Sequence, residues 1–304
     1  MYDGVLLLHK PQGFTSHDAV AKARGIFAQR RIGHAGTLDP MAEGLLVVLL
    51  GGATRASDYA AGQDKEYIAR LRLGLVTDTQ DVTGTALTEQ SADVPEEALR
   101  AALARFTGTV AQVPPMYSAV QVGGQRLYKL ARKGVEVERQ AREIHISALE
   151  LLPRADGLRP DEWDLRVVCS KGTYVRTLCH DLGAALGCGG CMAALTRTRC
   201  GRFSLADACT FEELEGRRDD LSPFLRPTEE VFSDLPAVTV NESGAVRARN
   251  GAFLTEGELS SGEAPPEGCL CRVFDGGRLL WLGESRALDR GGVAVFCKVS
   301  FFTA

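Results

Sequence analysis

The order of apolar and polar residues predicts strands and helices that alternate along the first half of the chain. An apolar run at 5–10 (VLLLHK) predicts a buried strand, and a second run at 45–51 (LLVVLLG) predicts another. Apolar residues at helical spacing predict a helix over 16–29, with Ser16 as its N-cap. The stretch GHAGTLDPMAEGLL at 33–46 leads into the second strand, and its glycines and proline predict a loop.

The middle of the chain continues this mixture. Strict alternation over 65–75 (KEYIARLRLGL) predicts a half-buried strand with Tyr67 near its start. Residues 76–97 carry six acids and no base, which we interpret as a solvated loop. Further strands are predicted at 144–152 and 163–169, and further helices from Pro95 to Phe106 and within 170–187.

The pattern changes after about Phe232. Short apolar runs now alternate with turns rich in glycine and proline, such as SSGEAPPEG and DGGR. Runs of this kind are typical of a small β-barrel or sandwich. We therefore predict two domains, residues 1–233 and residues 234–304.

The composition is that of a soluble globular protein, since 45% of the 304 residues are hydrophobic and 24% are charged. No apolar run reaches the ~18 residues that a membrane helix needs. The first residues, MYDGVLLLHKPQG, lack the basic region and cleavage site of a signal peptide. We expect a cytoplasmic protein that makes no membrane contact.

The nine cysteines are an odd number, which favours reduced thiols over a disulfide framework. One cluster offers an alternative, because Cys188 and Cys191 form a CxxC pair with Cys179, His180 and Cys200 nearby. A second CxxC at zinc-finger spacing is missing from the sequence. Small buried cysteines are therefore the better interpretation, and we expect no metal.

Net charge is −4, but the charge is unevenly distributed. Residues 166–202 hold six Lys or Arg and one Asp, and residues 121–145 hold six bases and three acids. Residues 203–304 hold ten bases and seventeen acids. Local field decides where a polyanion docks, so the two basic segments are candidate nucleic-acid contacts, or else a solvated basic face.

Asp39, in the glycine-rich loop, is the candidate for chemistry. A turn aspartate that caps the backbone is the simplest interpretation. Paired with Glu43, it could instead hydrolyse a glycosidic bond. Two other stretches add context: KEY places Tyr67 at a strand start, and KGTYVRTL places Arg176 in a glycine-containing turn. An aspartate, a tyrosine and an arginine together suit chemistry on a base taken out of its stack.

Five stretches, in order and at matching distances, resemble the bacterial tRNA pseudouridine-55 synthase family. The C-terminal part is similar to the small RNA-binding barrel, the PUA domain, that such enzymes often carry. Two departures are Ala35, where threonine is common, and the acidic C-terminal part. The five stretches are VLLLHKPQGFTSHD, RRIGHAGTLDPMAEGLL, KEYIARLRLGLVTDTQDVTG, PPMYSAVQVGGQRLYKLARKG and SKGTYVRTLCHDLGAALGCGG.

The resemblance implies an α+β pseudouridine-synthase fold with a mixed, mainly antiparallel central sheet and an RNA-gripping insertion at about 110–145. It implies an isomerase that breaks the N1–C1′ bond of the T-loop uridine, position 55 of tRNA, rotates the uracil and rejoins it through C5. It implies no cofactor and no metal. The implied partner is the T-arm of tRNA, with no obligatory protein partner and a monomeric enzyme.

Residue by residue, the resemblance assigns three catalytic positions. Asp39 matches the catalytic aspartate, which attacks C1′, removes the 2′ proton or attacks C6. Arg176 matches the arginine that pairs with it and would keep it ionised. Tyr67 matches the tyrosine that stacks on the flipped base and takes the C5 proton.

Further positions are implied to support the site or to hold RNA. His34 would hold the flipped RNA, Leu195 would pack near the uracil, and Lys10 would buttress the loop of Tyr67. Asp81 and Tyr174 would organise the site. The insertion would contact the RNA through basic residues, namely Arg126, Lys129, Arg132 and Lys133.

Two other classes remain open from the sequence. A tRNA-binding or tRNA-folding module would keep the basic surface without needing Asp39, Tyr67 and Arg176 together. A nucleosidase would use Asp39 and Glu43 and a small-molecule pocket, and it would leave the basic insertion unexplained.

Overall fold

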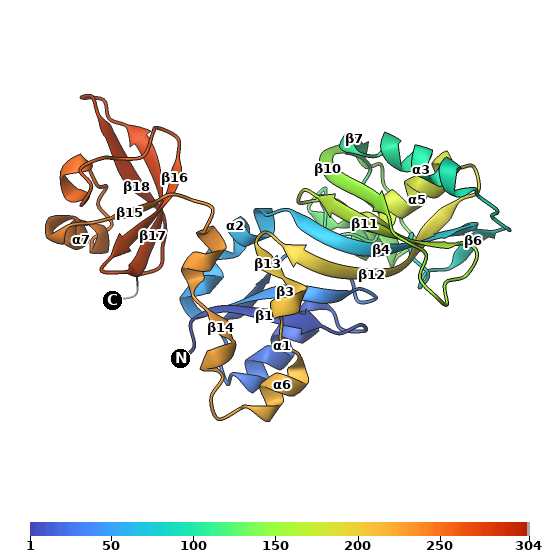
Figure 1. The fold of residues 1–304 in the computed structure, drawn as a ribbon, viewed down its shortest axis with the longest axis horizontal. Helices are drawn as coiled ribbons and strands as arrows, with labels where there is room; N and C mark the ends of the chain where they lie inside the picture. The colour runs from blue at the N-terminus through green and yellow to red at the C-terminus, as the bar shows by residue number, and fades with distance from the viewer. Residues whose placement is uncertain (303–304) are drawn as a thin grey trace.

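The computed structural model describes residues 1–302, and its largest part is a ten-stranded sheet (Figure 1). The strand order is β14-β1-β3-β12-β4-β11-β10-β7, with β2 beside β3 and β13 beside β12. Within the described residues of this sheet, β12 and β3 are the one pair of strands in parallel, so the α+β class with a mixed, mainly antiparallel sheet is confirmed. The strands are β1 (Gly4–Lys10), β2 (Ile32–Ala35), β3 (Glu43–Leu50), β4 (Lys65–Leu73), β7 (Gly108–Gln112), β10 (Arg142–Leu151), β11 (Glu162–Cys169), β12 (Gly190–Cys200), β13 (Phe203–Ser204) and β14 (Leu225–Arg226).

Strands β1 and β3 contain continuous apolar runs, at 5–8 and 45–50, and both of their faces are covered. One face, with Leu6 and Val48, packs on helices α1 and α6, and the other, with Leu7 and Val47, packs on η1 and α2. Alternation is absent from such strands, as expected for a sheet that is buried on both sides. The covering elements are α1 (Ser16–Ile26), η1 (Gly51–Ala56), α2 (Ser57–Gly62), η2 (Leu205–Asp207), α6 (Phe211–Gly216), η3 (Ser222–Phe224) and η4 (Thr228–Phe232).

The N-cap of helix α1 lies one residue earlier than the sequence predicts. Thr15 is the N-cap, since its hydroxyl accepts from the backbone N–H of Asp18 while the Asp18 carboxylate accepts from that of Thr15. This reciprocal capping box satisfies two free donors of the first turn. Ser16 is released from capping and instead bonds to Leu38. The helix ends at Ile26, because Ala28 adopts a positive φ of 48°.

Strand β4 crosses the middle of the sheet, between β12 and β11, and alternates buried and half-buried side chains as its sequence predicts. Its inward face, which includes Tyr67 and Leu71, packs beneath two helices, α3 (Glu96–Arg105) and α5 (Val175–Ala185). Figure 1 shows both helices on one side of the sheet, with α1 and α6 on the opposite side of the molecule.

Several segments differ from the sequence interpretation, among them β2, which overlaps the start of the stretch 33–46 that was predicted as a loop. The acidic loop contains a small hairpin, β5 (Leu75–Thr77) with β6 (Ala86–Glu89), and β12 is an eleven-residue strand to which the sequence pattern assigned no element. The insertion forms a hairpin of two short strands, each of two residues, followed by a short helix. These elements are β8 (Gln121–Val122), β9 (Gln125–Arg126) and α4 (Leu127–Ala131).

The C-terminal part is a four-stranded sheet of order β15-β16-β17-β18, packed on α7 (Figure 1). Within the described residues its ladder does not close, so the expected barrel is an open sheet. The reason is that its edges are extended by single bridges only, Val240 with Leu259 and Leu254 with Val295. The elements are β15 (Ala237–Thr239), α7 (Glu242–Arg249), η5 (Glu256–Glu258), β16 (Leu270–Asp275), β17 (Arg278–Ala287) and β18 (Val293–Ser300).

This sheet contacts the larger part through aromatic and polar side chains. The rings of Phe232 and Phe301 lie 5.5 Å apart, and the Tyr59 hydroxyl donates to the carboxylate of Asp234. Among the helices in residues 1–302, none has the length and apolar character needed to cross a membrane.

Candidate active site

Asp39 lies in the segment between β2 and β3 and is held by an arginine from a distant helix. Arg176 Nε lies 2.8 Å from Asp39 Oδ2, and Arg176 Nη2 donates to Asp39 Oδ1 at 3.1 Å. The Asp39 side chain is 35% exposed, while that of Arg176 is only 6% exposed. A two-pronged pair of this kind fixes the orientation of the carboxylate and leaves it reachable from outside.

Arg176 is fixed by the turn that starts α5. Gln112, at the end of β7, accepts from the backbone N–H of Tyr174 and donates to its carbonyl, at 2.8 and 3.1 Å. These bonds fix Tyr174, the N-cap of α5, which lies two residues before the arginine. The guanidinium also donates to the carbonyls of Thr79 and Tyr117, each at 3.0 Å. Arg176 therefore joins the Asp39 segment, the acidic loop and the base of the insertion.

Asp81 stands next to this cluster, with its Oδ2 3.8 Å from Arg176 Nη1. It is 5% exposed and accepts from the hydroxyls of Thr79 and Thr83 and from the backbone N–H of Thr83. A buried carboxylate with this many donors is well satisfied. It lies where it can orient Arg176, which in turn orients Asp39.

Tyr67 is 7% exposed and belongs to the cluster that contains Leu38, Met41 and Leu195. Burial raises the pKa of Tyr67 to about 12, against a smaller opposing effect of Arg197. The side chain is therefore a neutral phenol at neutral pH. Leu38 and Met41 flank Asp39 in sequence, so the tyrosine packs against the segment that carries the aspartate.

His34, on β2, is neutral in this environment. Burial, with smaller contributions from His17 and Arg197, lowers its pKa below the ordinary value of 6.5. The two histidine rings meet edge to face with centroids 5.7 Å apart, and Nδ1 of His34 is buried without a partner. The sequence analysis missed His17, which carries no signal apart from its residue type.

Lys10 holds a different loop from the one expected. Its Nζ donates to the carbonyls of Pro11, Phe14 and Ala42, at 2.9, 2.8 and 2.5 Å. Ala42 lies in the Asp39 segment, so Lys10 buttresses that segment and not the strand of Tyr67. Burial lowers the pKa of Lys10 to about 8, although the charge of Asp39 opposes the shift.

Four more hydrogen bonds hold the Asp39 segment and the start of β3, and the sequence pattern signals none of them. The backbone N–H of Leu38 donates to the Ser16 hydroxyl at 2.8 Å, and that of Gly13 donates to the Pro40 carbonyl at 2.7 Å. Arg197 of β12 donates to the carbonyls of Gly36 and Leu45. The segment is therefore fixed at almost every second residue around the aspartate.

The basic residues of the insertion lie on the surface. Arg132 lies over the Tyr128 ring, 5.6 Å from its centroid. In the described chain, no ion pair to an acid involves any of the four cations named for RNA contact, all of which are exposed: Arg126, Lys129, Arg132 and Lys133. Their charge is available to a polyanion.

The basic segment 166–202 is only partly exposed, since two of its six cations are buried, two are half-buried and two are exposed. Arg176 and Arg197 are 5% and 0% exposed, and Arg166 lies 2.7 Å from Glu66. Only Lys171 and Arg202 are exposed without an acid within ion-pair distance in the described residues.

Two alternatives left open by the sequence concern a metal site and a second carboxylate, Glu43. Within residues 1–302, no three His, Cys, Asp or Glu side chains gather as metal ligands, and all nine cysteines are free thiols. Glu43 is exposed at the start of β3 and accepts from the Thr196 hydroxyl at 3.3 Å.

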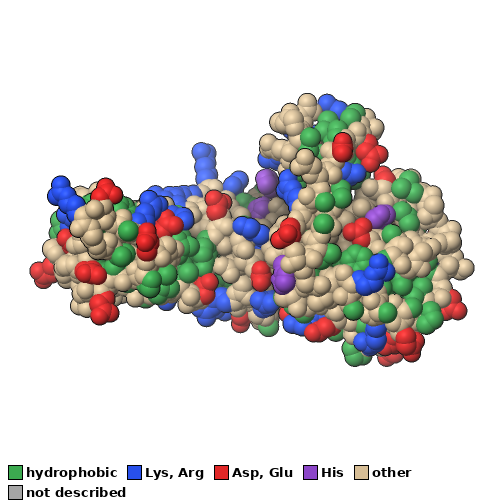
Figure 2. Space-filling view, turned by 90° about the horizontal axis from the view of Figure 1, so that it is seen from above, with side chains coloured by type: hydrophobic (Ala, Val, Ile, Leu, Met, Phe, Trp, Pro, Cys, Tyr) green, Lys and Arg blue, Asp and Glu red, His purple; other side chains and the backbone are tan. Residues whose placement is uncertain are grey.

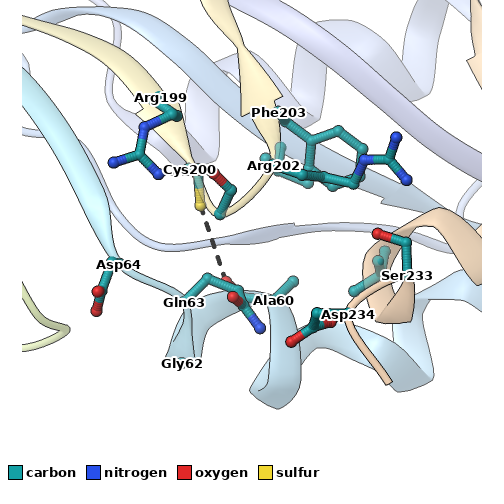
Figure 3. Close-up of a pocket in the computed structure, with 13 residues that line it drawn as sticks. Ala60, Gly62, Gln63, Asp64, Arg199, Cys200, Arg202, Phe203, Ser233 and Asp234 are labelled. Carbon is teal, nitrogen blue, oxygen red and sulfur yellow. Dashed lines mark hydrogen bonds between the residues drawn. The ribbon is translucent and has the colours of Figure 1, made fainter. Parts of the chain in front are cut away.

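Two hollows mark the surface. In Figure 2 a lobe rises beside a notch in which basic, acidic and histidine side chains gather. A separate pocket of about 400 Å³ lies between α2, the β12–β13 turn and η4, lined by Asp64, Arg199, Cys200, Arg202 and Asp234 among others (Figure 3). It contains none of the candidate catalytic residues.

Comparison with known proteins places the chain among the pseudouridylate synthases. Residues 24–175 match the family model described as TruB family pseudouridylate synthase (N terminal domain). Residues 176–233 match that of the tRNA pseudouridylate synthase B C-terminal domain. The chain belongs to the TruB family of pseudouridylate synthases, which are isomerases.

Relatives named tRNA pseudouridine synthase B match over most of their length. That of Heliobacterium modesticaldum is 45% identical over 295 residues, covering 94% of this chain and 92% of the relative. That of Symbiobacterium thermophilum is 49% identical over 250 residues, covering 82% of each.

Solved structures agree with this assignment. A Cbf5-Nop10-Gar1 complex contains a chain with a TM-score of 0.75 and 27% identity, covering 98% of this chain and 85% of that one. A chain of an H/ACA RNP bound to a substrate RNA containing 2′-deoxyuridine has a TM-score of 0.75 and 26% identity, covering 99% of this chain and 85% of that one.

Proposed function

We propose that this enzyme converts the uridine at position 55, in the T-loop of tRNA, into pseudouridine. The relatives' name, tRNA pseudouridine synthase B, supports tRNA as the substrate class. The observation that carries the catalytic assignment is the two-pronged pair between Asp39 and Arg176, half open to the outside. We assign Asp39 as the catalytic aspartate and Arg176 as the residue that orients it.

The reaction needs no oxidant, metal or cofactor. The N1–C1′ bond breaks, the uracil leaves with its electron pair and rotates, and C5 then forms a new bond to C1′. C5 loses its proton and N1 gains one, so that the product is an isomer of the substrate. Asp39 acts by attack on C1′, by removal of the 2′ proton or by attack on C6.

Tyr67 supplies a flat, buried phenol beside the Asp39 segment. Because its pKa is raised to about 12, only about one molecule in 10⁵ carries a phenolate at pH 7. Stacking on the flipped uracil is therefore its first role, and the neutral phenol can take the C5 proton only while its own hydroxyl proton passes to another acceptor. Leu195, in the same cluster, would pack near the base.

RNA binding falls to the insertion and to His34. The exposed cations of the insertion would contact T-arm phosphates, which makes binding dependent on salt. His34, which is neutral and half-buried, can donate or accept a hydrogen bond to the flipped nucleotide. We further propose a monomer in the cytoplasm, since one chain supplies every site residue and nine free thiols suit a reducing compartment.

The test is tritium release from an unmodified T-arm hairpin labelled at uridine C5, with wild type and Asp39→Asn compared. We expect release by wild type only, with the hairpin bound by both. Release by Asp39→Asn at a near-normal rate would refute the role of the aspartate. Tight binding without release by either protein would favour the tRNA-binding module.

A further inference from the structure

Arg197 is a charged side chain placed where a charge is costly. It is 0% exposed, and within residues 1–302 no carboxylate lies within ion-pair distance of it. Its Nη1 is buried without a hydrogen-bond partner. Its positive charge also contributes to the lowered pKa values of Lys10, His34 and Lys65, so its neighbours are basic as well.

A buried cation without a counter-ion costs free energy, and folds keep such groups mainly where function requires them. The two contacts that Arg197 makes identify that function. Its Nε donates to the Leu45 carbonyl at 2.7 Å, and its Nη2 donates to the Gly36 carbonyl at 3.1 Å. These carbonyls lie at the two ends of residues 36–45, which comprise the segment that carries Asp39 and the first residues of β3.

The backbone of β12 supports the same contact. Arg197 pairs with Gly44 in the only parallel register of the large sheet. A Cβ at position 44 would lie 2.7 Å from the Arg197 backbone nitrogen, so the two chains touch directly. On the other side, Arg197 is the cross-strand partner of Tyr67. One residue therefore lies against the aspartate's segment and beside the tyrosine.

We propose that Arg197 is a positioning residue for pseudouridine formation, which clasps both ends of the Asp39 segment and sets the distance from Asp39 to the base on Tyr67. This inference rests on the proposed function. Lys10 and Ser16 hold the inside of the segment, at Ala42 and Leu38, whereas only Arg197 joins its two ends. A lysine has one nitrogen and cannot donate along two fixed directions as a guanidinium does.

The experiment compares Arg197→Met and Arg197→Lys with wild type in single-turnover tritium release, hairpin binding and urea unfolding. A displacement of the carboxylate by about 1 Å costs about a hundredfold in rate. We expect Arg197→Met to lose roughly that factor and Arg197→Lys to lose roughly tenfold, with hairpin Kd within about threefold of wild type.

Leu46→Ala is the matched control. Leu46 is fully buried in β3, one residue beyond Leu45, and packs on the α1 side of the sheet, so its truncation destabilises the fold without removing a contact of the segment. We expect it to keep the wild-type rate. If Arg197→Met does not fold, Arg197→Lys decides the question.

Three results would overturn the inference: a folded Arg197 variant with the wild-type rate, a loss that matches a loss of affinity, or an equal rate loss in Leu46→Ala. Absence of release by wild type would instead refute the proposed function.

Discussion

Raising the pH should switch off the enzyme through Lys10 before it affects the fold. The Lys10 ammonium donates to three carbonyls, among them that of Ala42 in the Asp39 segment. A neutral amine has only two N–H groups, so at least one carbonyl loses its donor on deprotonation. Since burial lowers the pKa of Lys10 to about 8, this happens within a range where assays are practical.

The expected magnitude follows from that pKa. At pH 7 about nine-tenths of the lysine is charged, and at pH 9 about one-tenth is. If only the charged form holds the segment, single-turnover tritium release should fall about tenfold from the plateau to pH 9. Tyr67 and His34 do not titrate in this range, because the pKa of Tyr67 is raised to about 12 and that of His34 is lowered below 6.5.

Loss of folding cannot produce this decline through Lys10. Its pKa is about 8 in the folded chain and 10.5 in the unfolded chain, so between these values the unfolded chain binds more protons. Raising the pH in that range therefore increases the free energy of unfolding as far as Lys10 is concerned. Circular dichroism at pH 9 should show a folded protein. The rate of tritium release at the same pH should be reduced.

Two variants test the assignment. Lys10→Met should have a low rate without the alkaline decline. Lys65→Met removes another buried lysine, whose Nζ donates to the carbonyls of Ala61 and Gln63 and which also has a lowered pKa. It should keep the decline. A decline that persists in Lys10→Met, or a wild-type rate that stays constant to pH 9.5, would refute the reasoning.

Four further substitutions give distinct outcomes. Arg176→Ala should reduce tritium release by about 10² to 10³ and leave hairpin Kd within about threefold, and a loss of affinity alone would contradict its role. Tyr67→Phe should keep hairpin binding, because the stacking ring remains, and lose at least about tenfold in single-turnover rate if the hydroxyl handles the proton, whereas an unchanged rate would leave stacking as its role. Gly44→Ala should lower the free energy of unfolding by about 1–3 kcal/mol in urea, because position 44 has φ 105° and abuts the backbone of Arg197. Gly36→Ala should cost less, since its Cβ would meet only side-chain tips at 3.4 Å, and an equal cost would contradict the clash.

The sequence pattern predicted best where burial and period agree. The apolar run of β1 identifies a strand that is covered on both faces. The alternation of β4 identifies a strand that is covered more fully on one face than on the other. Strand β12 escaped prediction for a physical reason. Register shifts beside Met192 and Arg197 interrupt its alternation, and such bulges depend on neighbouring strands.

The residues of the candidate site also fall into two groups, those that the sequence identifies and those that only the fold reveals. Asp39, Tyr67 and Arg176 lie in recognisable stretches, and their residue types suggested the chemistry before their positions were known. Ser16 and Arg197 carry no such signal, because a serine near a helix start resembles a cap and an arginine in TRTRC resembles a surface residue. Their contacts, with Leu38 and with the two ends of the Asp39 segment, depend on tertiary packing.

The basic residues separate into two groups with different effects. By their charge along the sequence, residues 166–202 and the insertion are both predicted to form a surface for a polyanion. In the fold, Arg176 and Arg197 are buried around the Asp39 segment, and Arg166 is neutralised by Glu66. Removing a buried cation should therefore lower the rate more than the affinity. Removing Lys129 or Arg132, which are exposed, should lower the affinity and its salt dependence and leave the rate at saturation unchanged.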